Sequence, residues 1–349
     1  MRTMIEDFRI VPAGHCGSGA MRNLLYHYCD LDLEEGVVFG LGAGLDSVFF
    51  TYADAEPPFM LFGRGSSFEA DMAYTLGIDY QERMQTDDDA AWEEVRQEVI
   101  EGRPTMLSGD IFYLDYREFK VHFPAHRFIL LGFDEEAGEV YIADRINSYP
   151  ETCSMQALRD SRNPPVGIST YNQWGRFNSG KVDRSLPEAC GVALGITVNR
   201  MLGSDTSQRD LMAAAASNGE VCETGLKGMR TFLEHLRSWP ERDNAASHAQ
   251  YVDDAIIKFG TGGGFFRDHF STFMHWAREQ RPDLVSPEAL ELAVRAAKQW
   301  NELSPTMQRI VEAPGDRELW EQSFEQVEDI YLTESALFNT LGDTVLRAA

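Results

Sequence analysis

The sequence predicts an α+β protein in two domains, because its two halves follow different periodicities. Residues 1–150 mix short apolar runs of β type with a few helical stretches, whereas residues 205–349 are almost entirely helical in period. Between them, the segment RDSRNPPVGISTYNQWGRFNSGK is rich in Asn, Ser, Gly and Pro, which are loop and linker signals. We therefore expect a mixed domain over residues 1–160 and a mainly helical domain over residues 161–349.

Three elements of the first domain can be placed. Apolar residues at helical spacing (Ala20, Leu24 and Tyr28) predict a helix with Cys16 at its N-terminus. The segment AAWEEVRQEVIEG predicts an amphipathic helix that ends at Gly102. The apolar runs HRFILLGF and EVYIAD, joined by DEEAG, predict a β-hairpin with a five-residue loop.

Two Ser-Pro pairs predict helix starts in the second domain. Ser286-Pro287 and Ser304-Pro305 each fit an N-cap serine followed by a proline in the first turn. We expect a helix to begin at each pair.

Composition and spacing argue against several classes of protein. The formal charge of −25, from 56 acidic and 31 basic residues, argues against nucleic-acid binding. The sequence shows neither a run of roughly 20 apolar residues nor a signal-peptide core, so we expect a cytoplasmic protein without a membrane segment. Five scattered cysteines without a CxxC pair argue against disulfides and zinc.

Two further motifs are incomplete. FGLGAGLD has Leu45 where the dinucleotide fingerprint needs a small residue, so it predicts a turn with small packing residues. His122 and His126 have metal-like spacing, but Pro124 lies between them and would break a helix. We expect no metal and no bound cofactor.

Cys16 is the candidate nucleophile. The backbone N–H groups and the dipole at a helix N-terminus stabilise a thiolate, which is the reactive form of cysteine. Gly17, Ser18 and Gly19 follow and are small enough for a substrate carbonyl to approach the backbone amides. A buried structural cysteine remains the alternative, because free cysteine is among the most buried residue types.

The hairpin brings a histidine and a carboxylate together. If Asp134–Gly138 form the loop, Phe133 faces Glu139 and Asp144 faces Phe128, which shares a sheet face with His126. Diagonal neighbours on adjacent strands lie about 7–8 Å apart, within reach of an imidazole and a carboxylate. His126 is thus the candidate base and Asp144 its orienting acid.

The order Cys, His, Asp is that of the papain-like cysteine enzymes. His15 and His27 are alternative bases, but His15 adjoins Cys16 and His27 lies eleven residues farther along the same predicted helix. A structural, hydrogen-bonded His126 also stays open.

Several segments together resemble the butirosin biosynthesis protein H family. HCGSGAMRNLLYHY, VFGLGAGLDSVFF, GRPTMLSGDIFYL and HFPAHRFILLGFDEEAGEVYIADR carry the resemblance over nearly all of residues 12–160. VNRML and KFGTGGGFFRDHFSTFM resemble the helical domain of unassigned function that usually follows.

The resemblance implies a papain-like N-terminal domain with Cys16, His126 and Asp144 as its triad. It also implies an acyltransferase that moves an aminoacyl group from an acyl carrier protein to an aminoglycoside amine. The chain departs from papain-like peptidases in one respect, because FRIVPAGH offers no oxyanion-hole Gln before the nucleophile. The backbone amides of Cys16 and Gly17, helped by His15, would then have to bind the oxyanion.

We expect a cysteine-dependent acyltransferase that accepts a phosphopantetheine thioester and passes the acyl group to a small-molecule amine. Its partner would be an acyl carrier protein or peptidyl carrier domain, and it would contact neither nucleic acid nor membrane; a homo-oligomer is possible. Intramolecular cyclisation, hydrolysis as a thioesterase or amidase, and a non-catalytic binding role remain alternatives.

The helical domain is expected to close over the Cys16 site and to exclude water from the acyl-enzyme. The alternative is an oligomerisation or carrier-docking module remote from that site. The candidate substrate-binding residues are Asp110, Tyr113, Gly262, Gly263 and Arg267.

Overall fold

The computed structural model of the chain describes residues 1–52, 56–124, 126–164, 169–207 and 222–348. They fall into two compact units, each described here by itself. Unit 1 consists of Met1–Glu35 and Gly77–Asp183, and unit 2 of Gly36–Leu76 and Arg184–Ala349.

This division differs from the single boundary expected near residue 160. Residues 36–76 belong to unit 2, because their strand β2 (Leu45–Thr51) pairs with β10 (Cys222–Glu223). Gly40 in this segment packs so closely on the Phe273 ring that any side chain would clash. Linker signals are local, so they do not reveal pairing between distant segments. Residues 165–168 of the expected linker lie outside the described residues.

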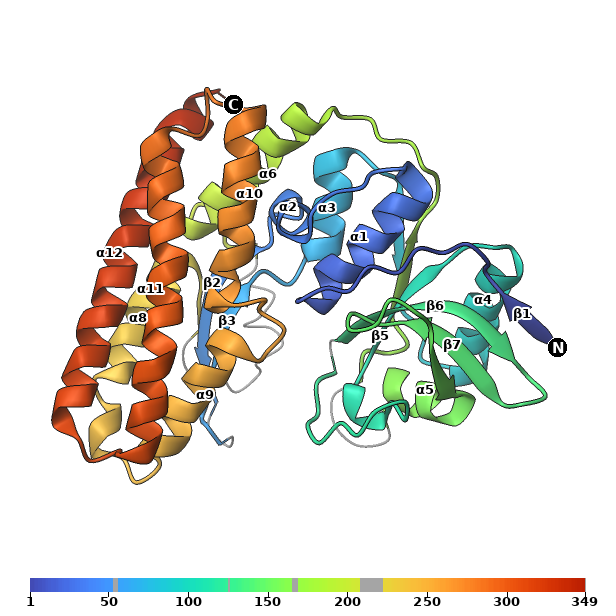
Figure 1. Cartoon of the computed structure of the whole chain (residues 1–349), viewed down its shortest axis with the longest axis horizontal. Coiled ribbons are helices and arrows are strands. Elements are labelled where there is room, and N and C mark those ends of the chain that lie inside the picture. The colour runs from blue at the N-terminus through green and yellow to red at the C-terminus, as the bar shows by residue number, and fades with distance from the viewer. Residues whose placement is uncertain (53–55, 125, 165–168, 208–221, 349) are drawn as a thin grey trace. The chain divides into compact units, whose positions relative to one another are not determined.

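Unit 1 is built on an antiparallel sheet (Figure 1). Among the described residues the sheet has seven strands in the order β4-β9-β5-β6-β7-β8, with β1 paired to β6. The elements of the unit are β1 (Arg2–Met4), α1 (Cys16–Cys29), β4 (Tyr80–Arg83), α4 (Asp88–Ile100), β5 (Thr105–Gly109), the 3-10 turn η1 (Ile111–Tyr113), β6 (His126–Asp134), β7 (Glu139–Ala143), β8 (Glu151–Ser154), α5 (Met155–Arg162) and β9 (Trp174–Phe177).

The core of unit 1 fixes the strand that carries His126. Val95 of α4 and Leu158 of α5 pack in one buried cluster with Phe128 and Leu130 of β6. His126 is the first residue of this strand, so its backbone is anchored by the packing that follows it.

The loop of the β6–β7 hairpin is one residue shorter than predicted. Asp134 pairs with Glu139, so the loop comprises residues 135–138 and Asp134 belongs to the strand. The Asp134 carboxylate accepts the backbone N–H groups of Glu136 and Ala137 across the turn, which explains why this residue ends the strand. The predicted pairing of Phe133 with Glu139 is therefore wrong by one residue.

A β-bulge restores the predicted alignment farther along the hairpin. The register shifts between Leu130 and Gly132, and beyond the shift Ile129 pairs with Ala143. The next residues in this register are Phe128 and Asp144. The bulge therefore cancels the error at the loop, and Asp144 comes to lie opposite Phe128.

Unit 2 combines a small sheet with long helices; α11 and α12 pack side by side (Figure 1). In its described residues the sheet has three strands in the order β10-β2-β3. Besides β2 and β10, its elements are α2 (Glu35–Leu41, starting on the last residue of unit 1), β3 (Phe59–Arg64), α3 (Phe68–Leu76), α6 (Leu186–Met201), α8 (Gly225–Leu236), η2 (Trp239–Glu241), α9 (Ala245–Ile257), η3 (Gly264–Phe266), α10 (Arg267–Gln280), α11 (Pro287–Glu312) and α12 (Arg317–Ala348).

One of the two predicted helix starts is confirmed. Ser286 caps α11, its side chain accepting the N–H of Ala289, and Pro287 is the first helical residue. Pro305 instead lies inside the same helix, so no helix begins there. The Ser304 hydroxyl donates to Asp253 of α9 (2.6 Å) rather than capping a helix. This tertiary contact overrides the local signal.

Arg267 is enclosed in unit 2 by an ion pair with Glu334. Its Nε and Nη2 donate to the two carboxylate oxygens of Glu334, each at 2.8 Å, and both side chains are only 1% exposed. Nη2 also donates to the hydroxyl of Ser47, and Trp300 Nε1 donates to Glu334. Arg267 thus holds together β2, α10, α11 and α12, which is a structural position.

Across the described residues, none of the helices combines the length and apolarity needed to cross a membrane.

We predict that Glu334→Gln destabilises the protein by about 3–5 kcal/mol, because it leaves the Arg267 charge buried without a counter-ion. Urea unfolding followed by circular dichroism measures the change in the free energy of unfolding. Glu328→Gln, on the same helix, is the matched control, because the Glu328–Arg237 pair is half exposed and should contribute less than about 1 kcal/mol. Equal effects of the two substitutions would contradict the structural role of Arg267.

Candidate functional site

Cys16 is the first residue of α1, as predicted, and is buried. His15 caps the helix, and its Nδ1 accepts the backbone N–H of Ser18 at 3.1 Å. A thiol in the first turn of a helix lies at the positive end of the helix dipole. The position therefore favours the thiolate.

His126 contacts both of the other predicted triad residues. Its Nε2 lies 2.9 Å from Oδ1 of Asp144, the residue that directly follows β7. Its side chain also hydrogen-bonds Cys16. Because Nε2 is engaged by Asp144, Nδ1 is the ring nitrogen left to meet the thiol. The structure thus brings together Cys16, His126 and Asp144.

The electrostatics of this group favour a charged imidazole. Burial alone would lower the pKa of His126, but the charge of Asp144 and hydrogen bonds to Asp144 and Cys16 outweigh it and raise this pKa well above its usual value. Burial likewise opposes ionisation of Asp144, yet His126 and the other hydrogen-bond donors hold the pKa of Asp144 below its usual range. An imidazolium beside Cys16 stabilises a thiolate.

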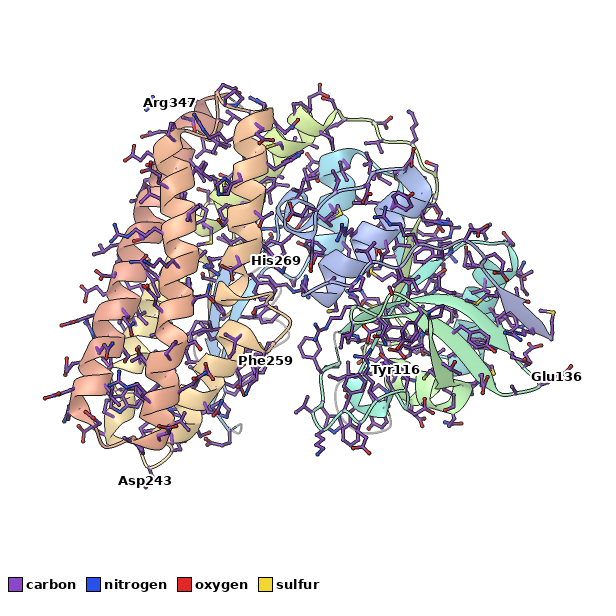
Figure 2. All side chains as sticks on the ribbon, viewed as in Figure 1. Tyr116, Glu136, Asp243, Phe259, His269 and Arg347 are labelled. Atoms are coloured by element: carbon purple, nitrogen blue, oxygen red, sulfur yellow. The ribbon has the colours of Figure 1, made fainter. Side chains whose placement is uncertain are left out.

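Tyr116 is a site residue that the sequence did not reveal. It is labelled in Figure 2, and its phenol donates to Oδ2 of Asp144 at 2.7 Å. Burial and the Asp144 charge raise the pKa of Tyr116, so the phenol keeps its proton. Tyr116 lies in an irregular segment between η1 and β6, where no periodicity or spacing marks it. It binds the carboxylate oxygen that His126 does not contact.

Arg145 connects Asp144 to the segment before Cys16. Its N–H donates to Oδ1 of Asp144 at 2.6 Å. Its carbonyl accepts the N–H of Ala13 at 2.7 Å, and its Nη1 donates to the carbonyl of Gly14 at 3.0 Å. The acid and the approach to Cys16 therefore form one hydrogen-bonded arrangement.

Glu35 holds the same segment from a second direction. Its two carboxylate oxygens accept the N–H of Gly14 and the N–H of His15, both at 2.8 Å, and the hydroxyl of Ser18 at 2.9 Å. No sequence pattern marks Glu35 as a partner of this segment, because it lies 19 residues beyond Cys16.

The residues after Cys16 pack tightly. A side chain at Gly19 would bring its Cβ to 2.5 Å from that of Ala13. The Ser18 N–H and hydroxyl are both engaged. Ser18 and Gly19 therefore serve packing and capping, rather than the open substrate approach that the sequence suggested. Cys16 and Gly17 lie in the helix's first turn, where N–H groups have no intrahelical acceptor.

Asp110 and His122 form a second histidine–carboxylate pair in unit 1. Asp110 is buried, accepts the N–H groups of Phe112 and Phe123, and lies 2.8 Å from Nδ1 of His122. Tyr113 belongs to η1, which Asp110 caps. The carboxylate is thereby satisfied within the protein, which gives Asp110 a structural position. His122 contacts Asp110, whereas His126 contacts Asp144, so the two histidines do not face one common site.

Gly262, Gly263 and Arg267 belong to unit 2. Any side chain at Gly262 would clash with the ring of His269. Gly263 has a φ of 105°, which favours glycine, and its N–H donates to the hydroxyl of Thr261. In this structure the two glycines take part in packing and hydrogen bonding within unit 2, and so does the enclosed Arg267.

Among the described residues, no group of three or more His, Cys, Asp or Glu side chains is arranged to hold a metal ion.

A histidine that joins a helix-terminal cysteine to a buried carboxylate is the arrangement used by enzymes with a cysteine nucleophile. Comparison with protein families matches residues 15–145 to "Butirosin biosynthesis protein H, N-terminal" and residues 154–341, more than half of the chain, to a domain of unknown function (DUF4872). The chain belongs to the butirosin biosynthesis protein H family, with the helical C-terminal domain that follows in it. A search of curated proteins found no match.

We predict that Cys16 reacts with iodoacetamide at pH 6, below the ordinary thiol pKa of about 8.5. The raised pKa of His126 keeps the imidazole charged there, and this charge supports the thiolate. Asp144→Asn lowers the His126 pKa, so the rate at pH 6 should fall about tenfold or more and the profile should move to higher pH. Tyr116→Phe should move the pH profile in the same direction, but by a smaller amount.

Mass-spectrometric mapping of the alkylated cysteines over pH 5–10 makes this measurement. Cys29 is an internal control, because burial raises the pKa of its thiol to about 11 and it should react only in alkaline solution. Coincident pH profiles for the wild type and Asp144→Asn would contradict the proposed electrostatics.

Proposed function

We propose that this protein is a cysteine-dependent acyltransferase of natural-product biosynthesis. The observation that carries the proposal is the contact of one imidazole, His126, with both Cys16 and Asp144. The name of the family refers to butirosin biosynthesis, which favours a biosynthetic transfer reaction over peptide hydrolysis.

The proposed reaction begins with the Cys16 thiolate and the His126 imidazolium. The sulfur attacks the carbonyl carbon of a thioester, and the tetrahedral intermediate expels the donor thiolate, which takes the proton from His126. An acyl-Cys16 intermediate and a neutral imidazole result. An amine then attacks this intermediate, gives its proton to His126 and expels the Cys16 thiolate. The amide is released and the initial ion pair is restored.

Donors at the helix N-terminus would stabilise the oxyanion of each tetrahedral intermediate. Cys16 and Gly17 are the first two residues of α1, and their backbone N–H groups would donate to the oxyanion. His15 is a further donor in this proposal. Its Nδ1 accepts the Ser18 N–H, so the neutral ring carries its proton on Nε2. These groups would replace the glutamine of papain-like peptidases.

A papain-like fold for unit 1 is part of the proposal. Three features support it: a cysteine at the start of a helix, a histidine at the start of a strand, and an acid at the end of the neighbouring antiparallel strand. Engagement of Nε2 by the acid, with Nδ1 toward the thiol, agrees with this arrangement.

The proposed donor is a phosphopantetheine thioester on an acyl carrier protein or peptidyl carrier domain in the cytoplasm. The proposed acceptor is a small-molecule amine. No resident cofactor takes part, because the thiol and imidazole carry every bond change of the scheme.

We predict that incubation with a panel of acyl-pantetheine thioesters adds one acyl mass to the intact protein, at Cys16. Cys16→Ala should stay folded and remain unlabelled, whereas Cys29→Ala should label like the wild type. Intact-protein and peptide mass spectrometry measure both. Labelling that persists in Cys16→Ala would overturn the proposal.

Adding amines to the acylated protein then separates the possible outcomes. Amide product in excess of free acid supports intermolecular transfer. Free acid at every amine concentration would indicate a hydrolase, and release of a lactam from acyl chains that carry their own amine would indicate a cyclase.

A further inference from the structure

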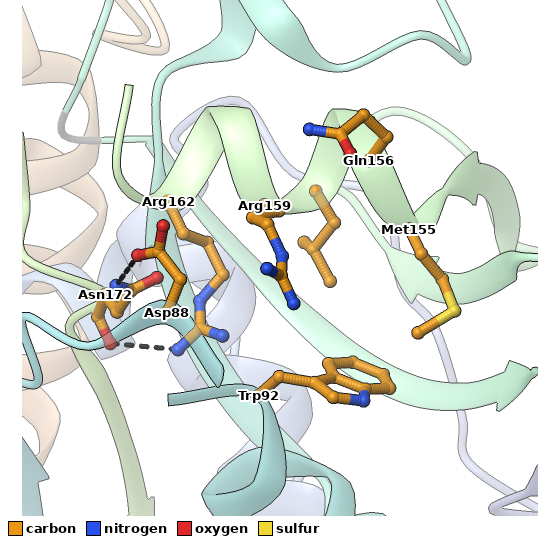
Figure 3. A pocket seen from close by; sticks show the side chains of 8 residues that line it. Asp88, Trp92, Met155, Gln156, Arg159, Arg162 and Asn172 are labelled. Atoms are coloured by element: carbon orange, nitrogen blue, oxygen red, sulfur yellow. Dashed lines mark hydrogen bonds between the residues drawn. The ribbon is translucent and has the colours of Figure 1, made fainter. Parts of the chain in front are cut away.

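A pocket lies in unit 1, between α4 and α5, and none of the triad residues lines it (Figure 3). Its volume is about 180 Å³. Its walls are Asp88, Trp92, Met155, Gln156, Leu158, Arg159, Arg162 and Asn172. Pockets for drug-sized ligands span roughly 300–1,000 Å³, so this one suits a smaller molecule.

Arg162 is the unusual member of the wall. It is only 2% exposed, yet its acceptors among the described residues are two backbone carbonyls, Asn172 O at 2.9 Å and Ala91 O at 3.5 Å. Its Nε has no acceptor among the described residues. A guanidinium carries five N–H donors, so these contacts leave it undersatisfied.

The carboxylates near Arg162 are engaged elsewhere. Glu94 accepts the indole N–H of Trp174 at 2.8 Å, and Asp88 accepts the side-chain amides of Asn163 and Asn172. Burial lowers the pKa of Arg162 to about 10 against the charges of these two carboxylates. Buried arginines are ordinarily paired with an anion, because an unpaired buried charge is strongly unfavourable.

The other walls complete a site for an anion with an apolar part. Arg159 supplies a second guanidinium, bound to Asp89 at the surface (2.8 Å) with 42% of its side chain exposed, so it can turn toward a ligand. Trp92 and Met155 supply apolar surface (Figure 3), and Leu158 adds to it. Because the chain carries a net charge of −25, an anion gains little from the protein as a whole and must be held by local donors.

We propose that this pocket binds a small molecule with a carboxylate or phosphate group, held by Arg162 and Arg159, and a short apolar part against Trp92 and Met155. Guanidinium groups recognise both oxyanions through paired N–H donors. The site goes beyond the proposed acyl transfer, and neither proposal depends on the other.

Isothermal titration calorimetry of the full chain tests this site with inorganic phosphate and with butyrate, at ionic strength held constant with chloride. The two arms distinguish a phosphate from a carboxylate head group. We expect saturable one-to-one binding in at least one arm. Arg159→Gln and Arg162→Gln should each weaken it roughly tenfold or more, since each removes charged hydrogen bonds.

Two further variants keep the test decisive even if Arg162→Gln fails to fold. Asp88→Asn retains the oxygen that accepts from Asn172 but removes a negative charge from the rim, so binding should tighten several-fold. Arg9→Gln, a surface arginine of unit 1 paired with Asp32, is the matched control and should bind like the wild type.

The proposal fails if neither anion binds saturably, or if Arg9→Gln weakens binding as much as Arg159→Gln. It also fails if Arg159→Gln and Asp88→Asn both leave the dissociation constant unchanged. Arg162 would then serve only to join α4, α5 and the segment at Asn172.

Discussion

The structure of unit 1 around the site depends on one buried carboxylate, Asp144. A buried charge is tolerated only where every oxygen has a donor, and Asp144 is surrounded accordingly by His126, Tyr116 and the N–H of Arg145. Satisfying Asp144 orients the imidazole toward Cys16. The same requirement places Arg145 where its carbonyl and guanidinium hold the segment before Cys16.

The positions of Cys16, His126 and Asp144 were predictable from sequence because these residues lie at the ends of regular elements. Cys16 starts a helix with apolar residues at helical spacing. In the hairpin, the assumed loop aligned Asp144 with Phe128, and the period-two alternation placed Phe128 on the same face as His126. That alignment succeeded although the loop was one residue shorter than assumed, because the bulge between Leu130 and Gly132 compensates. The bulge could not be recognised in the sequence. Residues 128–133 of β6 are all buried, so no alternation of apolar and polar residues reveals the shift in register.

Residues that act over long sequence separations could not be predicted in this way. Tyr116 and Glu35 reach the site from irregular segments or element ends, and their roles exist only once the chain is folded. The same limit explains the unit boundary, because the pairing of β2 with β10 joins residues separated by about half of the sequence. It also explains why the Ser304-Pro305 signal failed where Ser304 bonds Asp253.

Asp144 and Cys16 favour an imidazolium at His126, on which the proposed thiolate depends. Nitrogen-15 NMR of histidine-labelled protein measures this charge, with the His126 signals assigned by their loss in His126→Gln. We expect both ring nitrogens of His126 to be protonated at pH 7, with a titration midpoint well above the ordinary histidine pKa of about 6.5. A neutral His126 ring at pH 7 would contradict the account.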